Sequence, residues 1–222
     1  RYITSFFRYV FHFFIKFNII LDVIDMKKKI LIIIAVILLT VMTLFLLVLK
    51  LDNLKFKLSY EYINYIEYSN GKKIKVNIPL NNNIKYLNEE ELLNILKSGT
   101  GIVYFGYNSC PWCRNAIPIL IEAVNNHNID TIYYADIHKL NISKIRTELY
   151  SLIDDYLEVD NDDKKVLAVP DVYFLKNGKI IGEHRGTVEG YNNPYNGMNN
   201  SQKEELRTIY ENFIEEMEKW IN

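Results

Sequence analysis

The feature that most constrains this chain is the stretch Cys-Pro-Trp-Cys at residues 110–113, which holds its only two cysteines. It follows an apolar run at 101–105, typical of a buried strand, and opens an apolar pattern at helical spacing over 114–122. A cysteine at a helix N-terminus faces the positive end of the helix dipole and unpaired backbone N–H groups, which favour thiolate over thiol. Two intervening residues bring the second sulfur close enough to close a disulfide. The pattern therefore predicts a redox-active dithiol.

Other interpretations of the cysteine pair stay open at this point. A structural zinc site usually takes four Cys or His ligands, but the chain has no second cysteine pair and its histidines show no ligand-like spacing. The pair could also be an inert structural disulfide or two ordinary buried thiols, although a loop this short gains little chain-entropy stabilisation from a disulfide. We favour the redox site and expect neither a metal nor a cofactor.

The overall composition limits the class of protein. The chain has 222 residues and a formal net charge of -1, and 49% of its residues are hydrophobic. This length fits one medium-sized domain with appendages. A charge near zero leaves none of the basic footprint that nucleic-acid binding needs, so we expect no nucleic-acid partner.

An apolar segment near the N-terminus predicts a membrane anchor. Residues 30–49 carry no charge and are long enough to span a bilayer, and Met26 with three lysines stands directly before them. We therefore assign residues 26–50 to a transmembrane anchor that contacts the membrane through residues 30–49. A cleaved signal peptide is the alternative, but the apolar run is longer than a usual signal core and no small-residue cleavage site follows it.

The same lysines predict the orientation of the anchor. Cationic residues before a first apolar span hold that side in the cytoplasm, so the chain from Lys50 onward would lie outside. Because Met26 with its lysines looks like a natural translation start, we interpret residues 1–25 as a non-native or upstream segment. We expect a single-pass protein of the cell membrane with an extracytoplasmic domain.

The remaining chain divides into a polar stretch and a region of alternating elements. Residues 51–83 are rich in Tyr, Asn and Lys and are interpreted as a polar spacer, with a hairpin turn at Asn70-Gly71. From residue 84 the order is strand, helix, strand, helix, strand, helix, strand, strand, helix, which predicts parallel strands with helical crossovers and a late antiparallel hairpin. The predicted strands lie at 84–87, 102–105, 132–135, 172–175 and 179–184, and capping motifs at Asn88/Glu91 and Ser201/Glu204 begin the first and last helices.

This order, with the cysteine pair at the end of the second strand, resembles thioredoxin. Pro118 lies eight residues after Cys110, where thioredoxins carry the proline that kinks the active-site helix, and Val169-Pro170 precedes the hairpin, where they carry a cis-proline. The resemblance covers residues 84–222 and implies an α/β domain with the thioredoxin fold, a mixed sheet flanked by helices. It also implies that Pro170 is cis and that the Val169 backbone pairs with a bound peptide as an added strand.

Two departures separate this sequence from thioredoxins. Thioredoxins bury an aspartate six residues before the first cysteine, as a proton acceptor for the second one. Here that position is Tyr104, and a phenol is a far weaker base at neutral pH. Extra residues, largely a helix at 141–156, separate Asp136 from Pro170, so we expect an added helix before the cis-proline strand.

A finer resemblance points to thioredoxin-like proteins of Gram-positive bacteria known as bacteriocin transport accessory proteins. The segments Gly-Ile-Val-Tyr-Phe-Gly (101–106) and Cys-Pro-Trp-Cys-Arg-Asn (110–115) are similar to that family, as is the tail from Gly186 to Tyr195. The name of that family says less about chemistry than the dithiol does.

These observations give each residue of the predicted site a role. Cys110 is the expected nucleophile and Cys113 the resolving thiol, Pro111 and Trp112 tune the thiolate and the redox potential, and Val169 and Pro170 bind substrate. We expect a membrane-anchored, extracytoplasmic thiol–disulfide oxidoreductase that acts on protein or peptide thiols and disulfides, with a membrane electron-transfer partner as a further expectation. The alternative is a non-catalytic thioredoxin-fold accessory module for bacteriocin or peptide export. Reductant, oxidant and isomerase are left open because they share one scaffold.

Overall fold

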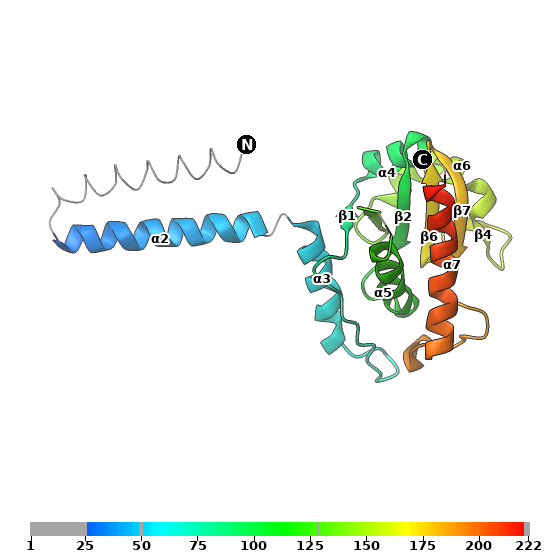
Figure 1. Ribbon diagram of the computed structural model, residues 1–222, viewed down its shortest axis with the longest axis horizontal. Coiled ribbons are helices and arrows are strands. Elements are labelled where there is room, and N and C mark those ends of the chain that lie inside the picture. The colour runs from blue at the N-terminus through cyan, green and yellow to red at the C-terminus, as the bar shows by residue number, and fades with distance from the viewer. Residues whose placement is uncertain (1–25, 49–50, 128, 220–222) are drawn as a thin grey trace. The chain divides into compact units, whose positions relative to one another are not determined.

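The computed structural model describes residues 26–48, 51–127 and 129–219. The chain divides into two compact units, residues 1–50 and residues 51–222, which are described separately (Figure 1). The prediction made for residues 1–25 lies outside the described residues.

The first unit contributes one long apolar helix, α2 (Met26–Val48). Its stretch Lys28–Phe45 has a mean hydropathy of 2.4, and at 1.5 Å per residue the helix is about 35 Å long, enough for a bilayer core of about 30 Å. The hydroxyls of Thr40 and Thr43 donate to backbone carbonyls one turn earlier, at 2.8 and 2.9 Å, so neither brings an unpaired polar group into the apolar surface. The helix has the length and composition of a membrane span or of a signal sequence.

The second unit is built on a five-stranded mixed sheet. Strands β1, β3 and β2 run parallel, and β6 and β7 add antiparallel pairs on the far side of β2. The central strands are almost wholly apolar because helices cover both faces of the sheet. In spatial order the strands are β1 (Ile84–Tyr86), β3 (Ile132–Asp136), β2 (Gly101–Gly106), β6 (Asp171–Lys176) and β7 (Lys179–Arg185).

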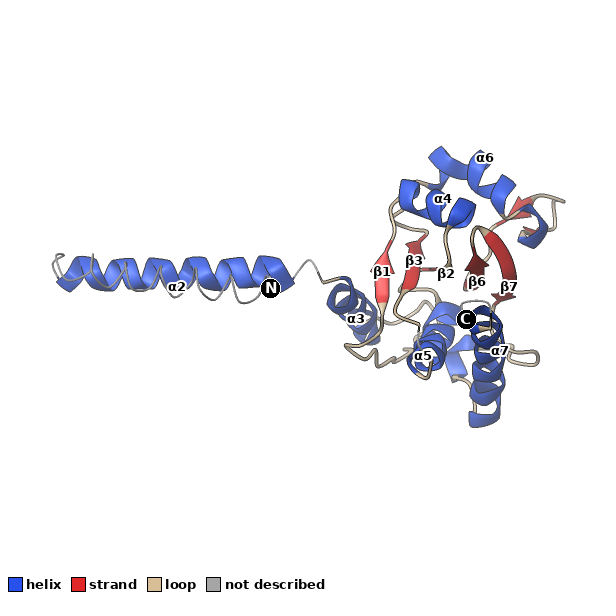
Figure 2. Cartoon of the chain, turned by 45° about the horizontal axis from the view of Figure 1, so that its top comes forward, coloured by secondary structure: helices blue, strands red, loops and turns tan. Residues whose placement is uncertain are grey.

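Two layers of helices enclose this sheet and create two hydrophobic cores (Figure 2). One face carries α3 (Asp52–Tyr62), α5 (Pro111–Asn125) and α7 (Asn200–Glu218), and the other carries α4 (Glu89–Ser98) and α6 (Ile142–Leu152). The predicted mixed sheet flanked by helices, with α6 as the added helix before the cis-proline strand, is confirmed. Short elements complete the unit: η1 (Ile63–Tyr65), η2 (Asp154–Tyr156), η3 (Pro194–Asn196) and an unpredicted hairpin of β4 (Glu158–Val159) with β5 (Lys165–Val166).

Local capping chemistry was predicted correctly at α4 but not at α7. The Asn88 side chain accepts the Glu91 N–H and the Glu91 carboxylate accepts the Asn88 N–H, which completes the predicted capping box. The last helix instead begins after Asn199, whose side chain forms the reciprocal pair with Gln202. Asparagine is as good an N-cap as serine, so the box two residues earlier in the chain takes the place of the predicted Ser201 box.

The predicted polar spacer, residues 51–83, is instead part of the domain. Helix α3 buries Phe56 and Tyr60 completely, and their rings pack against Tyr134 of β3. The expected turn is present, since Gly71 has a φ of 73° and its N–H donates to the Tyr68 carbonyl at 2.8 Å. No strand pair follows this turn in the described residues. The buried side chains sit among Lys, Asn and Tyr, which hid the apolar face of this segment in the sequence.

Candidate active site

The two cysteines lie at the N-terminus of α5, directly after the loop that follows β2. Cys110 is the N-cap residue in an extended conformation, and its Sγ accepts the Cys113 backbone N–H at 3.1 Å. Pro111 occupies the first helical turn, where its missing N–H costs no hydrogen bond. Both cysteines are free thiols; Cys110 is 3% exposed and Cys113 is fully buried. Cys110 is therefore the more accessible of the two cysteines, although little of its surface is exposed to solvent.

The environment pushes the pKa values of the two thiols in opposite directions. The pKa of Cys110 is lowered, first by a hydrogen bond from the Cys113 thiol and then by the backbone N–H groups of Cys113 and Trp112, which together outweigh burial. The pKa of Cys113 is raised well above its usual value, first by burial and then by the neighbouring Cys110 sulfur. Cys110 is thus the more readily ionised thiol of the pair, and Cys113 is the one that holds its proton more tightly.

The loop between β5 and β6 faces the Cys110 sulfur. The Val169-Pro170 peptide bond is cis, as predicted, and the Val169 carbonyl lies 4.0 Å from the Cys110 Sγ. Trp112 is half-buried, and its ring packs edge-to-face on Tyr191 with centroids 5.6 Å apart. The structure therefore brings together all six residues that the sequence assigned to the site.

The strand order, the dithiol at the start of α5 and the cis-proline beside its first sulfur decide the fold. The domain has the thioredoxin fold. The assignment rests on these features of the chain itself, and it agrees with the resemblance noted in the sequence.

Solved thioredoxin structures match this chain at low identity. Reduced thioredoxin pre-protein from Schistosoma mansoni is 21% identical, with 46% of this chain and 85% of that chain covered and a TM-score of 0.32. Thioredoxin O1 from Arabidopsis thaliana in the oxidized state is 22% identical over 58% of this chain and 98% of that one, with a TM-score of 0.35. Thioredoxin from Aeropyrum pernix is 18% identical over 56% of this chain and 87% of that one, with a TM-score of 0.31. No protein-family model matches the sequence, and no curated protein matches it.

Beside Cys113 of this thioredoxin-fold domain lies Tyr104, at the position where the sequence resemblance implied an aspartate. Tyr104 is fully buried, its hydroxyl lies 3.5 Å from the Cys113 carbonyl oxygen, and its ring stacks on Tyr134. Burial raises the pKa of Tyr104 well above its usual value, so it stays a neutral phenol at physiological pH. It can donate or relay a hydrogen bond near Cys113, but it cannot act as a carboxylate base there.

Sequence reasoning missed two buried ionisable residues that adjoin the dithiol and the cis-proline. Arg114 directly follows Cys113 and has no exposed surface, although arginine is rarely buried completely. Asp171 directly follows Pro170, accepts the Tyr173 hydroxyl at 2.9 Å, and has its pKa raised to about 8, first by burial and then by its hydrogen bond with Glu183. Arg114 stands inside the quoted Cys-Pro-Trp-Cys-Arg-Asn segment, but nothing in its spacing announces a structural role.

The lowered pKa of Cys110 leads to a measurable pH dependence. We expect thiolate absorbance of the reduced chain in detergent to titrate in two steps, the first below the free-cysteine value of about 8.5 and the second well above it. The rate of alkylation should rise through the first step, because the thiolate is the reactive form. Cys113→Ala removes the hydrogen bond from the Cys113 thiol, which is the largest cause of the lowered pKa, and should raise the pKa of Cys110. A single titration at or above the free value would contradict the assigned asymmetry.

Proposed function

We propose that this protein is a membrane-anchored thiol–disulfide oxidoreductase whose thioredoxin domain acts outside the cytoplasmic membrane on protein or peptide thiols and disulfides. The observation that carries the proposal is the geometry at Cys110: an N-cap sulfur that accepts the Cys113 N–H and faces the Val169 carbonyl. An inert pair of buried thiols needs neither this polarisation nor the adjoining cis-proline loop.

The chemistry follows from the opposite pKa shifts of the two thiols. The Cys110 thiolate attacks one sulfur of a substrate disulfide, the substrate S–S bond breaks, and the leaving thiolate takes up a proton. Cys113 then loses its proton and attacks the Cys110 sulfur of the mixed disulfide, which releases the second substrate thiol. The substrate gains two electrons and the chain is left with a Cys110–Cys113 disulfide. The reverse sequence oxidises a substrate dithiol, and the reduction potential of the pair decides which direction runs.

Val169 and Pro170 are proposed to hold the substrate during this exchange. The Val169 carbonyl already points at the reacting sulfur, and an extended peptide passing there could pair with the Val169 backbone as an added strand. Trp112, supported by Tyr191, would offer its exposed part as an apolar platform beside the same sulfur. In the direction of substrate reduction, a reductant must return the disulfide to the dithiol, and an electron-donating membrane partner is proposed for that step.

A redox titration tests the proposal. The full chain in detergent is equilibrated with reduced and oxidised glutathione, and the free thiols are counted by alkylation and mass. We expect one two-electron transition that loses both thiols together, and its midpoint would separate a reductant from an oxidant. Cys110→Ser and Cys113→Ser should each remove this transition. Serine variants that retain full biological function would instead favour the non-catalytic accessory module of an export system.

The proposed orientation gives a separate prediction. With Lys27 to Lys29 retained in the cytoplasm, protease added to intact protoplasts should digest the thioredoxin domain without lysis. A cytoplasmic protein of the same cells serves as the control for intact membranes. Full protection of the domain until lysis would place it in the cytoplasm, and release of the domain into the medium would show that α2 is cleaved as a signal sequence.

A further inference from the structure

The extended segment at residues 73–78 has one edge that is satisfied by side chains. The backbone N–H and carbonyl of Val76 form two hydrogen bonds of 2.8 Å with the side-chain amide of Asn64. The Ile78 N–H donates to the Glu61 carboxylate, and the Ile78 carbonyl accepts from the Lys57 ammonium group. The carbonyl of Ile74 accepts twice from Arg114, at 3.1 and 2.8 Å. Side chains from α3, η1 and α5 therefore hold this segment in place of a neighbouring strand.

The opposite edge of the same segment is unpaired. In extended chain, backbone N–H and C=O groups of successive residues point to alternate edges, and the buried side chains at 74, 76 and 78 follow this alternation. The groups of Lys73, Lys75 and Asn77 therefore point away from α3, and among the described residues they have no hydrogen-bond partner. Side chains at these three positions are exposed. A free edge of this kind is a template for pairing with another extended chain.

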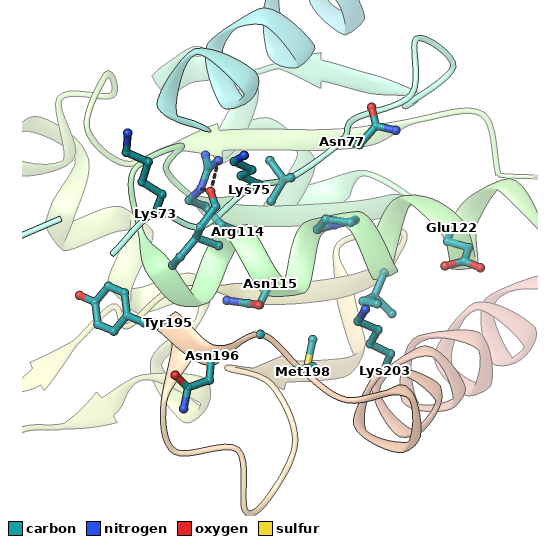
Figure 3. Close-up of a pocket in the computed structure, with 15 residues that line it drawn as sticks. Lys73, Lys75, Asn77, Arg114, Asn115, Glu122, Tyr195, Asn196, Met198 and Lys203 are labelled. Carbon is teal, nitrogen blue, oxygen red and sulfur yellow. Dashed lines mark hydrogen bonds between the residues drawn. The ribbon is translucent and has the colours of Figure 1, made fainter. Parts of the chain in front are cut away.

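This free edge lines a trough that runs along α5 (Figure 3). The cavity has a volume of about 450 Å³; residues 73–77 form one wall, residues 195–198 form the other, and Pro118 and Ile119 of α5 line it between them. Five extended residues reach roughly 17 Å at about 3.3 Å each. The trough thus offers backbone hydrogen-bonding groups on one side and room for a short extended segment. Its base on α5 is mixed, because Arg114 and Asn115 line it together with Pro118 and Ile119.

The charges around the trough are mainly positive. The ammonium groups of Lys75 and Lys203 contact no carboxylate among the described residues, whereas Lys73 pairs with Glu67 at 3.3 Å. The acidic residue at the far end, Glu122, is already paired with Arg207 at 2.9 Å. An occupant that carries carboxylates would therefore gain from Lys75 and Lys203 without facing an unpaired acidic group.

We propose that this trough binds an extended, acidic polypeptide segment, which adds as a strand to the free edge of residues 73–77. Backbone hydrogen bonds to alternate residues supply the affinity, and acidic side chains next to Lys75 and Lys203 supply the selectivity. A folded partner surface or a small anion would leave the row of backbone groups unused, so the free edge favours an extended chain.

The trough is separate from the dithiol. Neither cysteine lines it, and its two walls are joined by Lys72, which donates to the Asn196 side chain at 2.8 Å, and by Tyr68, whose ring packs on Tyr195. The Tyr68 hydroxyl donates to the Ser109 carbonyl at 3.0 Å, which places this bridge between the trough and Cys110. Binding at the trough therefore does not depend on the redox chemistry proposed above.

Fluorescence anisotropy tests the proposal with the full chain in detergent and a labelled short peptide of alternating Glu and Val that has no cysteine. We expect saturable binding that the Cys110→Ser, Cys113→Ser double variant retains. The same peptide N-methylated at every second residue keeps its charge but loses one hydrogen-bonding edge. Two such peptides are compared, one methylated at the odd-numbered residues and one at the even-numbered residues. One of them should bind about tenfold or more weakly and the other should bind normally, because a strand pairs through a single edge. Equal effects of the two methylated peptides would overturn strand addition.

Two pairs of variants assign the site. Asn77→Pro removes a free N–H without changing the charge and suits extended chain, so it should weaken binding about fivefold or more, with Asn77→Ala as its matched control. Lys75→Glu should weaken binding of the acidic peptide and relax its preference over a Lys/Val peptide, whereas Lys144→Glu on α6, on the opposite face of the sheet, should do neither. Unchanged affinity in both test variants would overturn the site. The methylated peptides decide the question if Asn77→Pro unfolds the chain.

Discussion

Cys113→Ser is expected to accumulate substrates that are covalently bound to Cys110. The first exchange step needs only the Cys110 thiolate, and release of the mixed disulfide needs the second thiol. In the structure the Cys113 Sγ is buried behind Cys110 and carries the raised pKa, so it acts after the first step. A non-reducing gel of membranes from cells that express the variant should show bands that disappear on reduction, and the trapped proteins can be identified from those bands.

Cys110→Ser is the matched control for this experiment. It retains one thiol at the other position of the pair, but that thiol is buried and protonated, so few or no trapped bands are expected. Equal trapping by both variants would contradict the assignment of Cys110 as nucleophile and Cys113 as resolving thiol. No trapping by either variant would favour the non-catalytic module. Pro170→Thr leaves both sulfurs in place and should accumulate mixed disulfides to a smaller extent, because it alters the loop that carries Val169 past the Cys110 sulfur.

The part of the fold that sequence could predict is the part specified by short-range patterns. Strand β2, the dithiol and helix α5 are contiguous, and the hairpin between β6 and β7 is announced by Asn177-Gly178, whose φ angles of 50° and 76° are those of a tight hairpin turn. The cis state of Pro170 came from the resemblance, since its offset from the hairpin matched thioredoxins. Each of these predictions needed only neighbours in the sequence or a known spacing.

The part that could not be predicted is held by contacts between distant residues. Helix α3 has buried side chains at Phe56 and Tyr60, but the lysines and tyrosines around them blur the helical periodicity. The helix packs on β1, which lies further along the chain. The extended residues after Gly71 have no partner strand in the part of the chain that the structure describes, so no pattern of paired strands marks them in the sequence. Arg114 is what joins these pieces, and its partners lie between 6 and 54 residues away in the chain.

Arg114 is a fully buried charged residue with several hydrogen-bond acceptors around it. It donates to the carbonyls of Tyr60 and Asn108 at 2.8 and 2.9 Å and to that of Ile74 from two of its nitrogens, and it also contacts the Asn64 amide oxygen. No carboxylate is among these partners in the described residues. The charge is met by backbone and amide oxygens and by the Tyr60 ring, whose centroid lies 5.9 Å from Cζ. Burial lowers the pKa of Arg114 from its usual value, but a guanidinium starts so high that it remains charged at neutral pH.

Arg114→Met should therefore destabilise the domain by about 3–5 kcal/mol, because it leaves three buried carbonyls without their donors while filling most of the same volume. Arg114→Lys should recover only part of this loss, since an ammonium has three donors and cannot reproduce the planar fork.

Urea unfolding of the full chain in detergent, followed by tryptophan fluorescence, measures the change in the free energy of unfolding. Arg146→Met on the exposed side of α6 is the control, and its free energy of unfolding is expected to stay within about 0.5 kcal/mol of the parent value. Because the lost bonds tie residues 60–76 to α5, amide hydrogen exchange should rise first in that segment. A variant as stable as the parent chain would mean that water replaces the guanidinium at these carbonyls. Arg114 would then not be the residue that holds α3 and residues 73–78 against α5.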